Sequence, residues 1–146
     1  MRSDQTRSME HLALVVWTAL EDGDLESFAD MLDSSVRWGP PGDPSPPCQS
    51  RDQVLSWYQR GQARGTSASV NNVTILGGHL LVELVVRGTD NARGRGGAAL
   101  RWQILTVQAG RITDIVGFDD RAEAIAYVED AVPNFPPDVV KDVIEE

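Results

Sequence analysis

The segment AGRITDIVGFDDRAEAIAYV, residues 109–128, has the pattern of a tight turn, a strand and a capped helix. Asp120 stands where the helical pattern begins and Glu123 follows three residues later, which is the spacing of a capping box. The buried face of the helix that follows Asp120 is expected to contain Ala122, Ile125 and Val128. Because Asp120 is explained as a helix cap, Asp119 at the strand end is left without a structural role and becomes a candidate functional carboxylate.

Strand patterns precede this segment. In HLLVELVVRG, residues 79–88, apolar and mixed positions alternate, so two faces are predicted. One face would carry Leu80, Val82, Leu84 and Val86, and the other His79, Leu81, Glu83, Val85 and Arg87. Glycine pairs and short turns separate the strands, as in an antiparallel sheet. His79 is expected at the surface or at a subunit interface.

The first third of the chain predicts helices. One is expected over residues 6–21, a second, short helix follows the cap Asp24, and a third begins at Ser50, which forms a capping box with Gln53. Helices first and strands afterwards indicate an α+β domain, with helices packed on one face of a curved antiparallel sheet. Such a cone has one open end, and its interior is suited to a small molecule.

Composition restricts the partners. The 146 residues contain 22 acidic and 13 basic side chains, a formal net charge of −9, which disfavours nucleic acids and anionic membranes. Cys48 is the single cysteine and the two histidines are far apart, so neither a disulfide, a metal site nor a cofactor is predicted. With no signal-peptide pattern and no long apolar run, a cytoplasmic location is expected.

Two regions are predicted along the chain: a domain over residues 1–128 and an acidic, proline-containing C-terminal tail over residues 129–146. In the tail, Val139, Val140 and Val143 could form one face of a short helix, or the tail could fray.

The order of three stretches resembles the NTF2-like superfamily, with its SnoaL-like branch the nearest. These are ALEDGDLESFADMLDSSVRW (19–38), SRDQVLSWYQR (50–60) and WQILTVQAGRITDIVGFDDRAEAI (102–125), and the resemblance covers residues 9–128. It implies an NTF2-like cone and a homodimer. It does not imply one activity, because this fold hosts isomerases, cyclases, hydrolases and binders without catalysis.

The residues of ketosteroid isomerase are not retained at the matching positions. Its oxyanion-hole tyrosine falls on Val16, its general base on Gly39, and its protonated acid on Gln103 or Trp102. Valine cannot donate a hydrogen bond and glycine cannot take a proton, so this chemistry is not expected.

Comparison with two other members of the superfamily leaves Asp119 as the tentative catalytic residue. Limonene-epoxide hydrolase would place its arginine on Gly88 and its aspartates on Asp90 and Gly117, of which only Asp90 keeps its chemistry. The SnoaL-type cyclases place a carboxylate near Gly117. Asp119 lies two residues further along the same strand face, about 7 Å away, and is the tentative catalytic residue.

This comparison orients the sheet and predicts an apolar pocket. The expected lining consists of Val16, Trp17, Trp38, Trp57, Tyr58, Leu84, Val86, Trp102, Gln103 and Ile115. Phe118 is a further aromatic candidate. Of Arg101 and Gln103, one but not both is expected to face inward, and Arg101 is expected to be exposed or at an interface.

The predicted function is that of a homodimeric SnoaL-like protein that binds a small hydrophobic molecule and lacks a recognised catalytic set. One alternative is a polyketide- or terpenoid-type isomerase, cyclase or dehydratase in which Asp119 shuttles a proton and Gln103 polarises a carbonyl. Another is a protein-binding module. The mixed outer sheet face, with Leu81 and Val85 among charges, is compatible with a dimer contact.

Overall fold

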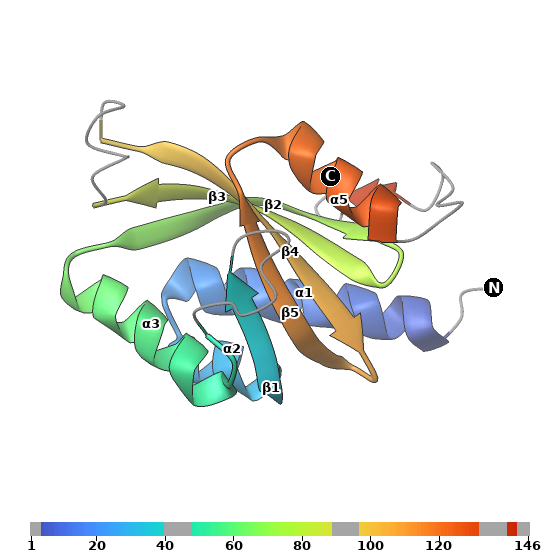
Figure 1. The fold of residues 1–146 in the computed structure, drawn as a ribbon, viewed down its shortest axis with the longest axis horizontal. Helices are drawn as coiled ribbons and strands as arrows, with labels where there is room; N and C mark the ends of the chain where they lie inside the picture. The colour runs from blue at the N-terminus through green and yellow to red at the C-terminus, as the bar shows by residue number, and fades with distance from the viewer. Residues whose placement is uncertain (1–3, 40–47, 89–96, 132–139, 143–146) are drawn as a thin grey trace.

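The structure, a computed structural model, describes residues 4–39, 48–88, 97–131 and 140–142. Its helices and strands follow the α+β order that the sequence predicts (Figure 1). The elements are α1 (Asp4–Asp22), α2 (Leu25–Asp30), β1 (Leu32–Gly39), α3 (Arg51–Ala63), β2 (Ser67–Leu76), β3 (His79–Arg87), β4 (Ala99–Gln108), β5 (Arg111–Phe118), α5 (Arg121–Ala131) and β6 (Val140–Asp142).

The strands form a single sheet in the order β1-β5-β4-β3-β2-β6. Strands β2 to β5 pair antiparallel with their neighbours in sequence, and Figure 1 shows how strongly they twist. β1 lies parallel to β5, with Trp38 opposite Ile115. The sheet is therefore mixed, which corrects the expectation of a wholly antiparallel one: β1 and β5 are distant in sequence, so no hairpin sets their direction.

The last described strand, β6, lies at the other edge of the sheet. It pairs antiparallel with β2, and Val140 is opposite Leu76. Residues 140–142 are thus extended and not helical, while Val139 and Val143 lie outside the described residues. Helix α5 runs to Ala131, beyond the boundary expected at residue 128.

Side chains cap α2, α3 and α5 as the sequence predicts. The capping oxygens belong to Asp24, Ser50 and Asp120. The backbone amides that donate to them are those of Ser27 at 3.2 Å, Gln53 at 3.2 Å and Ala122 at 2.7 Å. In α3 the return bond of the box goes from the amide of Gln49 to Gln53 Oε1, at 2.7 Å, one residue earlier than expected. These bonds satisfy amides that have no partner within the helix.

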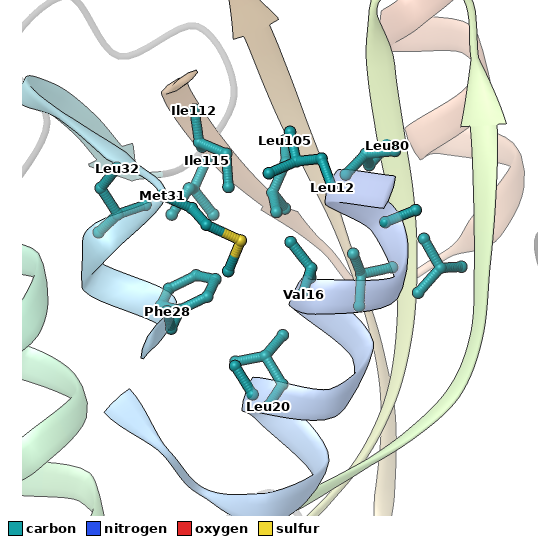
Figure 2. Close-up of a cluster of buried hydrophobic side chains, with 14 of the residues drawn as sticks. Leu12, Val16, Leu20, Phe28, Met31, Leu32, Leu80, Leu105, Ile112 and Ile115 are labelled. Atoms are coloured by element: carbon teal, nitrogen blue, oxygen red, sulfur yellow. The ribbon is translucent and has the colours of Figure 1, made fainter. Parts of the chain in front are cut away.

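The inner face of the sheet packs against α1 and α2, and this part of the cone is solid. Figure 2 shows the α1 side chains Leu12, Val16 and Leu20 directed toward residues from α2 and the strands. Their neighbours in this cluster include Phe28, Met31, Leu32, Leu80, Leu105, Ile112 and Ile115. Val16 and Ile115 are fully enclosed, so they belong to the core.

Helix α5 packs on the opposite face of the sheet (Figure 1). The buried cluster beneath it consists of Leu76, Leu81, Ile104, Phe118, Ala124 and Val128. The same chain therefore covers Leu81, which corrects its expected role in a dimer contact, while Phe118 packs in this cluster and also lines a small hollow beside it. In α5 itself Ala124 is buried and Ala122 is exposed, because Ala124 and Val128 are one helical turn apart.

His79 is buried, which corrects its expected surface position. Its exposed fraction is 8%, because β3 is an internal strand with β2 on one side and β4 on the other. This burial lowers the pKa of His79, against the opposing effects of a hydrogen bond to the backbone of Leu76 and of the Asp114 charge.

Candidate functional site

A cavity of about 990 Å³ lies beside the solid core, between the end of α1, helix α3 and the adjoining parts of β2, β3 and β4. Its volume is at the upper end of the range, roughly 300–1,000 Å³, that is usual for small-molecule sites. Leu84 and Val86 of β3 line it with aliphatic surface, and Ala68 and Ala99 of the adjacent strands leave space.

Aromatic side chains form one wall of the cavity. This aromatic wall consists of Trp38 from β1 and the consecutive residues Trp57 and Tyr58 from α3. The rings of Trp38 and Trp57 have centroids 4.2 Å apart, and Trp57 meets Tyr58 edge to face at 5.5 Å. Trp57 is 40% exposed, so it stands at the opening of the cavity. Phe28 supports Tyr58 from behind at 5.4 Å. A flat hydrophobic ligand would find a large rigid contact surface here.

Three uncharged polar groups converge at the inner end of this wall. They form the polar cluster, which consists of Trp38, Tyr58 and Gln103. Gln103 Nε2 donates a hydrogen bond to Tyr58 Oη at 3.3 Å. Trp38 Nε1 and Gln103 Oε1 are buried and have no hydrogen-bond partner of acceptable geometry within the described ranges. Gln103 is only 8% exposed, although the residue lines the cavity.

The titratable groups nearest the polar cluster are held protonated near neutral pH. Burial raises the pKa of Tyr58 to about 12, and the adjacent Gln103 amide and Trp38 indole oppose this rise only in part. Burial also raises the pKa of the Cys48 thiol, against the effect of the Arg60 charge. Cys48 is held next to the site by backbone hydrogen bonds with Trp38, at 3.0 and 3.3 Å. A phenol and a thiol in this state donate hydrogen bonds and do not act as bases.

Carboxylates are found at the rim of the large cavity. Glu21 and Asp22, at the end of α1, are both exposed. Glu21 Oε1 is already engaged, because it accepts a hydrogen bond from the Val70 amide at 2.8 Å. Arg60, Arg64 and Arg101 also line the cavity, whereas the buried polar atoms of the polar cluster belong to neutral donors and acceptors.

A smaller hollow of about 390 Å³ adjoins the large cavity, and the two share Trp38 and Arg101. Asp119 lies here and forms a hydrogen-bonded ion pair with Arg101. The exposed fractions of the two side chains are 37% for Arg101 and 64% for Asp119. Gly117 leaves room for the arginine, because a Cβ atom at this position would be 3.0 Å from Arg101 Nη2.

The SnoaL-like domain model matches residues 15–115, which span α1 to β5 and include the polar cluster. The chain belongs to the SnoaL-like family. No curated protein matches it.

Solved structures similar to this SnoaL-like chain support the fold. A candidate ketosteroid isomerase from Kribbella flavida is 18% identical, with a TM-score of 0.63, and the match covers 79% of each chain. A candidate polyketide cyclase from Xanthomonas campestris is 21% identical, with a TM-score of 0.61, and the match covers 86% of this chain and 99% of that one. An uncharacterised cystatin-fold protein from Novosphingobium aromaticivorans is 11% identical, with a TM-score of 0.60 and coverage of 75% and 96%. At these identities the likeness concerns the NTF2-like cone and not the activity.

Six of the residues expected to line the pocket of this SnoaL-like domain surround the large cavity. These are Trp38, Trp57, Tyr58, Leu84, Val86 and Gln103. Val16 and Ile115 belong to the solid core, and Trp17 is partly buried against it. Val16 and Ile115 are thus core residues and Trp17 lies partly buried beside them, and none of the three lines the large cavity.

Trp102 lies on the outer face of the sheet, which corrects its expected inward orientation. Its Nε1 donates a hydrogen bond to Glu83 Oε1 at 2.9 Å, and its ring packs against the cluster beneath α5. Trp102 and Gln103 are adjacent in β4, so their side chains point to opposite faces.

Arg101 was missed as a cavity residue although the sequence contained the signal. Arg101 and Gln103 are two positions apart in one strand and therefore share a face, so both line the large cavity. The candidate Asp90 lies outside the described residues.

The described residues contain no group of three or more His, Cys, Asp or Glu side chains that could hold a metal ion. None of their helices is long and apolar enough to cross a membrane.

Proposed function

We propose that this SnoaL-like protein binds a small, flat hydrophobic molecule in the large cavity. The observation that carries the proposal is the aromatic wall of Trp38, Trp57 and Tyr58, which faces a space of about 990 Å³. Leu84 and Val86 provide the opposing apolar surface. A ligand that buries its faces against these side chains gains affinity at about 25 cal/mol for each Å² of apolar surface removed from water.

The names of the similar structures agree with a flat ligand. Two of these proteins are named for polyketide and ketosteroid chemistry. Because their identities with this chain are low, they support the class of ligand and not a reaction.

Catalysis is the second candidate, with Asp119 as acid or base and Gln103 polarising a carbonyl. The observation in its favour is that the hollow containing Asp119 shares Trp38 and Arg101 with the large cavity. Against it, the carboxylate is engaged by Arg101 and mostly exposed. Binding without a dedicated catalytic set is therefore the function that the site favours.

A matched pair of variants tests the proposed site. Ala68→Phe places a ring in the large cavity, whereas Ser69→Phe places the same ring on the other face of β2. Titration of tryptophan fluorescence with flat polycyclic ketones and terpenoids should show saturable binding to the unmodified protein. We expect Ala68→Phe to weaken binding by about tenfold or more, which corresponds to the loss of one well-buried contact group. Ser69→Phe should remain within about twofold.

The absence of a response to every hydrophobic class would contradict the proposal and favour the protein-binding alternative. Equal losses in Ala68→Phe and Ser69→Phe would place the ligand elsewhere on the protein.

The homodimer and the cytoplasmic location also remain predictions. Light scattering should give about twice the chain mass of 15.9 kDa for a homodimer. A mass equal to one chain would contradict it.

A further inference from the structure

The polar cluster has hydrogen-bonding capacity that the described part of the chain leaves unused. Trp38 Nε1 and Gln103 Oε1 are buried and have no hydrogen bond of acceptable geometry there, although the indole is near enough to the Tyr58 hydroxyl to lower its pKa. A buried polar atom without a partner is destabilising, so few are retained in native proteins. Both residues line the large cavity, so these atoms belong to side chains that a bound ligand would contact. His79 Nδ1 is also without a partner, but His79 does not line either hollow described above.

The unused groups have opposite hydrogen-bonding roles. The indole of Trp38 can only donate a hydrogen bond, whereas Gln103 Oε1 can only accept one. Tyr58 Oη already accepts from Gln103 Nε2, which leaves the phenol proton for a further acceptor. Since the pKa of Tyr58 is about 12, this proton stays in place at neutral pH.

The unused groups are also uncharged. Three arginines line the cavity: Arg101 of β4, which is paired with Asp119, and Arg60 and Arg64 at the end of α3, whose side chains are exposed. A ligand anion next to Gln103 Oε1 would meet an acceptor and not a donor, which is unfavourable in a buried site. The cluster is therefore complementary to a neutral ligand.

We propose that the ligand is a neutral hydroxy-ketone, with a carbonyl oxygen and a hydroxyl group within a few bonds of each other. The carbonyl oxygen accepts from Trp38 Nε1 and the Tyr58 hydroxyl, and the ligand hydroxyl donates to Gln103 Oε1. This inference rests on the proposed function, because it assigns the polar part of the molecule that the aromatic wall binds.

A matched series of probes distinguishes the proposed hydrophobic binding from the proposed polar contacts. Benzoin has a carbonyl next to a hydroxyl, deoxybenzoin has only the carbonyl, 1,2-diphenylethanol has only the hydroxyl, and bibenzyl has neither. Benzil has two carbonyls and no hydroxyl. All five share two phenyl rings on a two-carbon link, so their apolar surfaces are similar. Affinities are measured by isothermal titration calorimetry with the full chain.

We expect benzoin to bind about tenfold more tightly than deoxybenzoin or 1,2-diphenylethanol, and bibenzyl to bind most weakly, as expected when buried groups gain partners. In Gln103→Met the preference for benzoin over deoxybenzoin should fall below twofold. In Trp38→Phe the preference for deoxybenzoin over bibenzyl should fall in the same way. Thermal melting of each variant checks that it is folded, and the series on the unmodified protein tests the proposal even if a variant does not fold.

Three results would overturn the inference. Equal affinity for all five probes would leave hydrophobic binding intact and remove the polar assignment. Tighter binding of benzil than of benzoin would mean that the Gln103 amide is turned round and presents its NH₂ group, so that the ligand needs acceptors only. Lack of binding by all five would overturn the inference alone if the flat polycyclic ketones still bind, and the proposed function as well if they do not.

Discussion

Gln103 of β4 and Tyr58 of α3 are joined by a hydrogen bond of 3.3 Å, from Gln103 Nε2 to Tyr58 Oη. The two residues are 45 positions apart, and this bond links the sheet to the helix that carries most of the aromatic wall. In this bond the phenol oxygen accepts, so its own proton is left to be donated to another group, and the phenol stays protonated at neutral pH.

The stability of the protein should depend on the Tyr58 proton in alkaline solution. Burial raises the pKa of Tyr58 from 10.0 to about 12. Below pH 10 both the folded and the unfolded chain keep this proton; between about pH 10 and 12 only the folded chain keeps it. The free energy of unfolding should therefore fall as pH rises through this window, by about 1 kcal/mol for each pH unit from this group.

Urea denaturation of the unmodified protein and of Tyr58→Phe at several pH values between 8 and 11 measures this contribution. The phenylalanine variant should lack it, so the difference between the two free energies should shrink above pH 10. Parallel curves would contradict the predicted role of Tyr58.

Gly88 should tolerate no side chain. It has a φ of +86°, and a Cβ atom would be 2.3 Å from the carbonyl oxygen of Gly65. Gly110 has a similar φ of +78°, but nothing lies within 4 Å of its would-be Cβ. Gly110→Ala should therefore cost about 1 kcal/mol for the left-handed conformation alone. Gly88→Ala should cost about 3 kcal/mol or more, since the backbone has to move. Equal losses in chemical denaturation would show that the close approach is not structurally important.

Ser50 should stabilise the helix that carries Trp57 and Tyr58. Its Oγ accepts the amide of Gln53 at 3.2 Å. Ser50→Ala should lower the free energy of unfolding by about 1 kcal/mol. Ser56→Ala is the matched control, because Ser56 is exposed in the middle of α3. There alanine is the better helix former, so we expect no loss or a gain of a few tenths of a kcal/mol. Equal destabilisation by both changes would exclude the cap as the cause.

Asp119 should be dispensable for binding. Its carboxylate pairs with Arg101 at the surface of the small hollow, where ion pairs contribute at most about 1 kcal/mol. We therefore expect Asp119→Asn to change benzoin affinity by less than twofold and to leave the folded state intact. If a substrate is found, this variant also decides between the two candidate functions. Loss of turnover with unchanged affinity would establish Asp119 as the acid or base.

The sequence by itself determined the local structure. The caps Asp24, Ser50 and Asp120 were predicted from residues at most three positions away, and alternation in β3 predicted that Leu80, Val82 and Leu84 share the inner face. These features depend on contacts between near neighbours in the chain, so a short stretch of sequence contains the information. The resemblance extended this local pattern to the correct α+β cone. The inward position of Arg101 follows from the same kind of alternation, because Arg101 and Gln103 are two positions apart in β4.

Only the tertiary structure decided which part of the interior is solid and which is hollow. Val16 and Tyr58 both have the composition of pocket residues, but Val16 is packed between α1 and the sheet while Tyr58 faces the cavity. The parallel pairing of β1 with β5 and the packing of α5 on the outer face were likewise absent from the local pattern. The physical reason is that a cavity is the space left between elements that are far apart in sequence. Its size and lining depend on their separation and orientation, and no single stretch of residues specifies either.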